Sequence, residues 1–255
     1  MTIAPQQAEV IMSKVPKITA FFWVMKICAT TLGETAGDLL SMTLKVGYAV
    51  SSTILIGMFI VSLLIQLKAK SYNPLLYWTV ILATSTAGTT MSDYMDRTLG
   101  LGYAVGSTIL VTILLAVLAF WQFNVGSLSV KDIKTPKVEM FYWTAILFSN
   151  TLGTALGDFL ADTSGLGFAG GALLIAGLLA LLLVAHYYTQ LSGIVLFWIA
   201  FVLTRPFGAT MGDVLTKSHA KGGLGYGTIG SSIVLLSILV VCVLFATLKQ
   251  RRAIA

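Results

Sequence analysis

Charged side chains are scarce in this sequence: Asp, Glu, Lys and Arg make up 10% of the 255 residues, whereas 57% are hydrophobic. A soluble domain ordinarily carries charge on about a quarter of its residues. The polar surface is too small to cover a globule in water, so lipid must be the solvent for much of the chain. Cysteine is also scarce, and Cys28 and Cys242 lie in apolar stretches, which excludes a disulfide framework and a zinc motif. We expect a lipid bilayer as partner, and no nucleic acid.

Long apolar runs are abundant instead. Eight runs are each long enough to cross about 30 Å of hydrocarbon, and they lie at residues 18–44, 46–67, 73–95, 101–123, 138–160, 166–188, 191–215 and 225–248. Residues 1–17 contain no such run, which predicts a short tail and not a cleaved signal peptide. We therefore predict an all-α integral membrane protein with eight transmembrane helices.

The lysines and arginines between the predicted spans indicate the orientation. Ten lie on the side of the two termini, and four lie on the opposite side, namely Lys45, Arg97, Lys217 and Lys221. The positive-inside rule then places both termini in the cytoplasm. We interpret the four opposite charges as solvated loop residues.

One repeat organises the whole chain. A tryptophan near the start of each odd-numbered span is followed by a glycine ten residues later and by an aspartate fifteen residues later. The tryptophans are Trp23, Trp78, Trp143 and Trp198, the glycines are Gly33, Gly88, Gly153 and Gly208, and the aspartates are Asp38, Asp93, Asp158 and Asp213. Because each repeat crosses the membrane twice, all four copies are parallel.

The spacing of the tryptophans predicts how the repeats are grouped. Successive tryptophans are 55, 65 and 55 residues apart, and the longer spacing contains a charged linker. We predict two four-helix halves of two repeats each. The predicted segments are an N-terminal tail at 1–17, a first half at 18–123, a cytoplasmic linker at 124–137, a second half at 138–248 and a C-terminal tail at 249–255.

A short motif carries a resemblance to a known family. Thr-Leu-Gly-Glu-Thr-Ala-Gly-Asp at 31–38 returns as Thr-Leu-Gly-Thr-Ala-Leu-Gly-Asp at 151–158. In this motif repetition the chain resembles a family of bacterial membrane-anchored proteins made of tandem repeats of unknown function. The resemblance covers nearly the whole chain and implies the repeat architecture and a multi-pass protein of the bacterial inner membrane. It implies no substrate.

Each odd-numbered span carries a polar stripe, because residues four apart share one helix face. At 7, 11 and 15 residues after each tryptophan the stripes read Thr30, Glu34 and Asp38; Ser85, Thr89 and Asp93; Asn150, Thr154 and Asp158; and Arg205, Ala209 and Asp213. Ionisable groups inside a membrane normally face a bundle interior or a watery cavity. If the four helices converge, Glu34 and the four aspartates form an all-oxygen metal site, flanked by Thr30, Thr89, Asn150 and Thr154. Hard cations favour such ligands: protons, Mg²⁺, Mn²⁺, Ca²⁺ or a trivalent ion.

Two basic residues, Lys26 and Arg205, fall inside the predicted spans. Lys26 lies eight residues before Glu34, about 12 Å along the helix, which is too far for a direct ion pair. Arg205 has the same separation from Asp213. We interpret both as internal counter-charges that neutralise a carboxylate on a neighbouring helix when the site is empty. Competition between them and a substrate ion would couple binding to conformation.

Structural explanations compete with the functional ones. Pairs of small residues such as Gly33 and Gly37 let helices approach closely without any ligand. The four aspartates also fit as residues at the membrane boundary that cap a turn.

The main hypothesis is a transporter of a hard multivalent metal cation, with export as one direction and protons as one coupling ion. The metal is then the substrate, and no cofactor is expected. The alternatives are a transporter of a small organic cation, contacted by aromatic residues such as Trp78, and a non-transporting scaffold or sensor. Whether the chain forms a homo-oligomer stays open. An enzyme is not expected, since an intramembrane aspartyl protease needs two carboxylates that share a proton and no Gly-x-Gly-Asp motif occurs.

Overall fold

The computed structural model describes residues 14–254, and helices joined by short loops make up this part of the chain, without a strand. Eight long helices follow the order of the predicted segments. They are α2 (Ala20–Asp38), α3 (Tyr48–Lys68), α4 (Pro74–Asp93), α5 (Tyr103–Val125), α6 (Pro136–Asp158), α7 (Gly167–Tyr188), α8 (Gly193–Thr216) and α9 (Gly227–Ile254). Five of them, α3, α5, α7, α8 and α9, are long and apolar enough to cross a membrane. The other three carry the polar stripes, which lower their mean hydropathy.

Local sequence signals explain where these helices begin. The side chains of Thr19, Asn73 and Thr135 each accept a hydrogen bond from a backbone N–H in the first turn of α2, α4 and α6. Pro74 and Pro136 occupy the first helical position, where a missing N–H costs nothing. These caps fix the starts of α2, α4 and α6, whereas Ser192 at the start of α8 makes no side-chain cap hydrogen bond.

The far ends of α2, α4 and α6 differ from the predicted boundary caps. Each runs directly into one π-helical turn, η1 (Leu39–Thr43), η2 (Tyr94–Thr98) and η4 (Phe159–Thr163). Asp38, Asp93 and Asp158 stand at these junctions and make no side-chain cap hydrogen bond. The interpretation of these aspartates as caps is therefore wrong. The Gly47 and Gly102 residues that follow have φ of 83° and 73°, which glycine adopts without strain.

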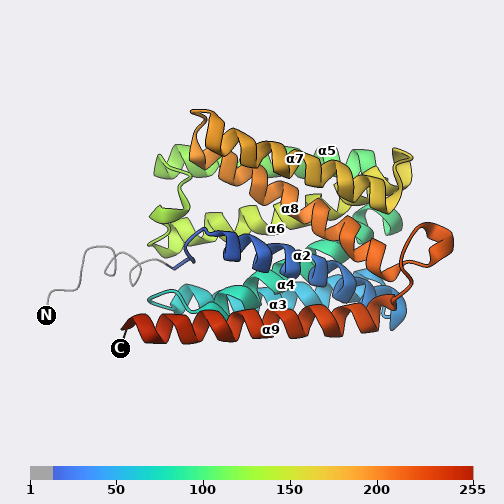
Figure 1. The fold of residues 1–255 in the computed structure, drawn as a ribbon, viewed down its shortest axis with the longest axis horizontal. Coiled ribbons are helices and arrows are strands. Elements are labelled where there is room, and N and C mark those ends of the chain that lie inside the picture. Colours follow the sequence, from blue (N-terminus) through green and yellow to red (C-terminus); the bar gives the residue numbers. More distant parts are fainter. Residues whose placement is uncertain (1–13, 255) are drawn as a thin grey trace, which may run out of the picture.

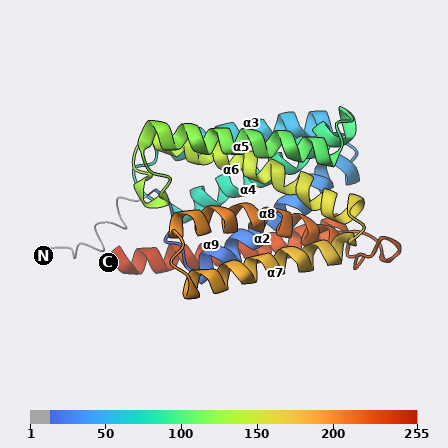
Figure 2. The same cartoon turned by 90° about the horizontal axis from the view of Figure 1, so that it is seen from above.

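Four helices form a closed inner ring. α2 packs on α4, α4 on α6, α6 on α8, and α8 on α2. The other four helices cover this ring from outside, as two views at right angles show (Figures 1 and 2). α3 packs on α4, α5 on α6, α7 on α8 and α9 on α2. Each outer helix thus packs on the ring helix of the next repeat, so the chain forms one ring and not two separate four-helix halves.

Glycines allow the ring helices to touch. A Cβ on Gly33 would overlap Ser85 of α4, and one on Gly153 would overlap Arg205 of α8. The remaining two junctions follow the same rule, with Gly88 against Asn150 and Gly208 against Thr30. In every case the glycine ten residues after a tryptophan contacts the residue seven after the next tryptophan. The predicted role of these glycines in close helix packing is confirmed.

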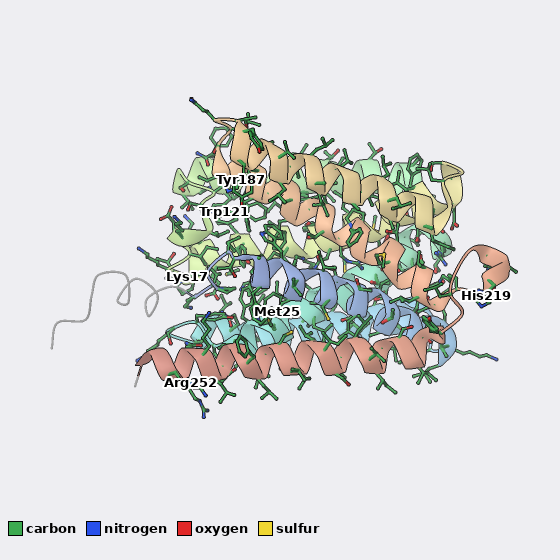
Figure 3. The ribbon with its side chains drawn as sticks, viewed as in Figure 1. Lys17, Met25, Trp121, Tyr187, His219 and Arg252 are labelled. Carbon is green, nitrogen blue, oxygen red and sulfur yellow. The ribbon has the colours of Figure 1, made fainter. Side chains whose placement is uncertain are left out.

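The two ends of the bundle have different contents. Lys17 and Arg252 lie at one end, which we call the terminal end, and His219 lies at the opposite end, which we call the loop end (Figure 3). Between the ends the outer helices expose apolar side chains, such as Leu115 at 60% and Leu181 at 65%. The polar stripes face inward, and the apolar surface faces outward.

Candidate functional site

A buried ion pair lies at the centre of the ring. Arg205 of α8 is 0% exposed and Glu34 of α2 is 3% exposed. The Nη1 and Nη2 atoms of Arg205 each donate to Oε2 of Glu34 at 3.1 Å. The predicted counter-charge role of Arg205 thus has a partner on a neighbouring helix. Such a pair is stable in an apolar interior only when further hydrogen bonds satisfy it.

The other two ring helices supply those hydrogen bonds. Nη2 of Arg205 donates to the hydroxyl oxygens of Thr89 at 2.5 Å and Thr154 at 2.6 Å. The two hydroxyls lie 3.2 and 3.3 Å from Oε2 of Glu34. All four repeats therefore contribute one side chain to this central layer. In the fourth repeat, Ala209 stands at the position that Glu34, Thr89 and Thr154 occupy in the others. Its small side chain leaves room for Arg205, which lies one helical turn earlier.

Toward the terminal end, Lys26 occupies a different environment from the predicted one. Its Nζ donates to Oδ1 of Asn150 at 3.4 Å and lies 4.1 Å from the centre of the Phe201 ring. Among residues 14–254 it forms no ion pair with a carboxylate, so the expectation that Lys26 neutralises one is wrong. Asn150 also donates to Thr84 at 2.9 Å. The amide and the aromatic ring, and not a carboxylate, stabilise this amine.

The hydroxyl of Thr30 is also taken by protein groups. Its Oγ1 lies 3.0 Å from the carbonyl oxygens of Lys26 and Ile27 and 3.3 Å from that of Thr204. Thr30 therefore joins α2 to α8, and Asn150 joins α6 to α4. Neither side chain belongs to the group of carboxylates nearer the loop end.

Two basic side chains each bridge a pair of the repeated aspartates at the loop end. Nζ of Lys217 lies 2.9 Å from Asp38 Oδ2 and 3.0 Å from Asp213 Oδ1. Arg97 contacts Asp93 through Nε at 3.0 Å and Asp158 through Nη2 at 2.9 Å. We call these two arrangements the Lys217 clasp and the Arg97 clasp.

Both clasp cations lie beyond the predicted spans and stay charged. Burial disfavours their charged forms, but the paired carboxylates raise the pKa of Lys217 and of Arg97 above their ordinary values. The interpretation of these two residues as solvated loop charges is wrong. A sequence signal could have found them, since each stands four residues after its aspartate and nineteen after its tryptophan.

Three carboxylates, and not five, come together. One oxygen each of Glu34, Asp38 and Asp213 lies within 4.8 Å of the other two, and all three residues are buried. We call these residues the carboxylate triad. Asp93 and Asp158 share Arg97 without a third carboxylate, because Thr154 stands at the repeat position that Glu34 occupies in the first repeat. The expectation of one site with all five carboxylates is therefore wrong.

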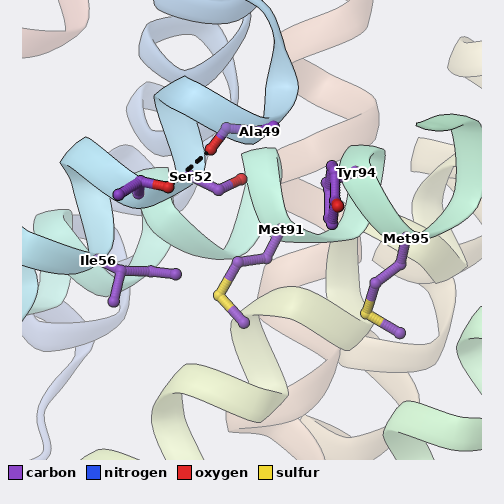
Figure 4. Close-up of a pocket in the computed structure, with 7 residues that line it drawn as sticks. Ala49, Ser52, Ile56, Met91, Tyr94 and Met95 are labelled. Atoms are coloured by element: carbon purple, nitrogen blue, oxygen red, sulfur yellow. Dashed lines mark hydrogen bonds between the residues drawn. The ribbon is translucent and has the colours of Figure 1, made fainter. Parts of the chain in front are cut away.

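A pocket at the loop end reaches the triad at Asp213. It has a volume of about 490 Å³, and its lining includes Asp213, both clasp cations, Asp162 and Lys221. A second pocket of about 310 Å³ lies outside the ring between α3 and α4, where Met91 and Met95 face Ala49 and Ile56 (Figure 4). No charged side chain lines that second pocket. Only the first pocket combines space with the charges of the ring.

Hydrogen bonds between polar side chains join the helices at the terminal end. Lys14 donates to Glu139 at 2.7 Å, and Gln66 donates to the same carboxylate at 2.8 Å. Deeper in the ring, the hydroxyls of Tyr77 and Tyr142 lie 2.6 Å apart. These contacts occupy the terminal end of the polar interior, whereas the charged pocket lies at the loop end. Sequence reasoning missed Glu139, which stands outside the stripe pattern.

A family model matches the chain four times. Its description is Repeat of Unknown Function (DUF347), and the matches cover residues 21–72, 76–126, 141–192 and 196–252. The chain belongs to this family. Each DUF347 match contains one ring helix and the outer helix that follows it, so the predicted four tandem repeats are confirmed. Comparisons with curated proteins and with solved structures found no match.

Proposed function

We propose that this DUF347 protein is a multi-pass membrane transporter of a hard multivalent metal cation. One observation carries the proposal: the ammonium group of Lys217 lies on two carboxylates of the triad. A tethered cation occupies the place that a substrate cation would take. All ligand atoms of the triad are oxygens, which hard cations prefer.

The charges of the triad favour a divalent ion. With all three carboxyl groups ionised, Glu34, Asp38 and Asp213 carry three negative charges, and Arg205 returns one positive charge through its pair with Glu34. Without Lys217 the net charge is −3 + 1 = −2, and one divalent cation neutralises it. Uncompensated charge is costly in the interior of a membrane protein. Exchange of the Lys217 ammonium for a divalent ion avoids that cost.

The ring also supplies a pathway. The stripe positions of all four ring helices are buried, and they run from Lys26 through the central layer to the pocket at the loop end. A buried polar column inside an apolar coat is the arrangement that transporters use near the bilayer midplane. We place the protein in a bacterial inner membrane with both termini in the cytoplasm, on the distribution of basic residues and the family resemblance.

The aromatic side chains give less support to an organic cation. Trp78 and Trp143 are 2% and 0% exposed, and they line neither of the two pockets. An organic cation needs a cavity for its carbon groups. A metal ion needs only the short contacts that the triad offers.

Flux into proteoliposomes tests the proposal. Wild type, Glu34→Gln, Asp38→Asn and the control Asp162→Asn are compared with Mg²⁺, Mn²⁺, Ca²⁺ and tetramethylammonium. Asp162 lines the same pocket but lies outside the triad. We expect flux of a divalent ion in wild type and control, and its loss in the two triad variants.

Two results would contradict the proposal. Folded wild-type protein that moves none of the metal ions would exclude metal transport. Flux of tetramethylammonium alone would favour the organic-cation alternative. Thermal unfolding in detergent shows that each variant is folded before its flux is compared.

A further inference from the structure

The two clasps lie at the seams between the two halves of the sequence. The first half contains α2–α5 and the second contains α6–α9, so the ring has one seam between α4 and α6 and another between α8 and α2. Arg97 joins Asp93 of α4 to Asp158 of α6 across the first seam. Lys217 joins Asp213 of α8 to Asp38 of α2 across the second. Each clasp therefore ties one half to the other.

No corresponding ion pair holds the ring helices within a half. Among residues 14–254, none joins α2 to α4 or α6 to α8. Close glycine contacts occur at all four junctions of the ring, such as Gly33 against Ser85 within a half and Gly88 against Asn150 at a seam. Among residues 14–254, ion pairs therefore distinguish the seams from the junctions within a half. Movement of α2 and α4 away from α6 and α8 at the loop end would thus break both clasps and no ion pair within either pair of ring helices.

The clasps occupy positions that a gate requires. The side chains of Arg97 and Lys217 are 30% and 21% exposed, whereas their carboxylate partners are at most 5% exposed. Both cations line the pocket at the loop end, so either can turn toward water there. Behind them lie the triad and the central layer.

The opposite end of the ring is held across the seam between α4 and α6 by other groups. The Tyr77 and Tyr142 hydroxyls join α4 to α6 at 2.6 Å. Gln66 of the first half donates to Glu139 of the second at 2.8 Å. Breaking the Arg97 clasp would therefore leave these contacts at the terminal end in place.

We propose that Arg97 and Lys217 form a two-part gate that closes the loop end of the transport pathway. This inference rests on the proposed function. When both clasps break, the halves part at the loop end and the triad becomes accessible to a cation from that side. Lys217 also competes with the arriving cation for Asp38 and Asp213, whereas Arg97 contacts no triad residue and acts as a latch alone.

Thiol labelling tests the gate independently of transport. A reporter Thr154→Cys is placed in the central layer of a Cys28→Ala, Cys242→Ala protein in lipid nanodiscs. Its rate of reaction with a charged thiol reagent measures access from water. We expect Arg97→Gln with Lys217→Gln to raise the rate at least tenfold, and each single change to raise it less.

A matched control and a second reporter separate gating from unfolding. Lys221→Gln removes a positive charge from the same pocket, and Lys221 forms no ion pair among the described residues. It should leave the rate unchanged. A Thr84→Cys reporter lies on the terminal side of the central layer and should stay slow in the double variant.

Either of two results would overturn the gate. The first is a double variant whose Thr154→Cys reporter reacts as slowly as in the parent protein. The second is an equal rise in the labelling rate when Lys221→Gln replaces the double change, or when the reporter is Thr84→Cys. The labelling result does not depend on the substrate. If the clasp variants raise the labelling rate but the protein moves no metal ion, the proposed function is contradicted and the gate is still supported.

Discussion

Removal of one partner from the Glu34–Arg205 pair should destabilise the protein more than removal of both. Glu34→Gln leaves the guanidinium of Arg205 in the centre of the ring without an anion. Its remaining acceptors are the hydroxyls of Thr89 and Thr154 and the carbonyl of Ser85. An unpaired buried charge costs about 3–5 kcal/mol, and neutral hydroxyls offset little of it.

Arg205→Met instead leaves the carboxylate of Glu34 without a cation. Glu34 then keeps two hydroxyl donors, Thr89 and Thr154, at 3.2 and 3.3 Å. We expect a cost of about 3 kcal/mol, at the lower end of the same range. The double variant Glu34→Gln with Arg205→Met buries no charge in this layer. Replacement of a whole buried pair is often close to neutral, so we expect a cost below about 2 kcal/mol.

The assay is reversible unfolding of the four proteins in mixed detergent micelles with increasing denaturing detergent. The two single costs sum to about 6–8 kcal/mol, so the double-mutant cycle should give a coupling of at least about 4 kcal/mol. Single variants that cost less than about 1 kcal/mol, or a double variant whose cost equals the sum, would refute this reasoning.

The same double variant separates stability from transport. If Glu34 is a ligand of the transported ion, the folded double variant should show no metal flux. If it keeps wild-type flux, the pair serves only to stabilise the ring.

Three further predictions concern packing, pH and the tail. Gly153→Ala should cost about 1–3 kcal/mol because its Cβ would overlap a side chain of α8, whereas Gly57→Ala, with no atom within 4 Å, should be neutral or slightly stabilising in the same unfolding assay. Burial raises the pKa of Asp96 to about 6, so its carboxyl favours folding below pH 4 and this contribution is lost as pH rises to 6. Asp96→Asn should therefore raise the melting temperature at pH 7.5 and not at pH 4, and an equal effect at both would contradict the assignment. Lys14→Gln should cost about 3 kcal/mol by leaving a buried carboxylate unpaired, and exposed Lys17→Gln should change stability by less than about 0.5 kcal/mol.

The sequence by itself determined the helices, their repeat and the inward face. Apolar length sets where a helix can be buried in lipid, and a spacing of four residues sets which side chains share its face. Both properties are local, so they can be read without knowledge of neighbours. The spacing of the glycines also predicted close helix packing, and the contact of Gly33 with Ser85 confirms it.

Only the tertiary structure decided which charge meets which. Arg205 reaches Glu34 because α8 closes the ring onto α2, and no local spacing specifies that closure. Lys26, like Arg205, lies eight residues before a carboxylate on its own helix, yet its amine contacts Asn150 and Phe201. Long side chains cross helix interfaces, so their partners depend on the order of the helices around the ring.

The same reason explains why five predicted ligands became three. Asp93 and Asp158 match Asp38 and Asp213 in their position in the repeat, and each pair forms ion pairs with one basic residue. The difference comes from the central layer, where one seam has Glu34 and the other does not. Sequence fixes the residue on each helix face, but the seam at which two faces meet is a property of the assembled ring.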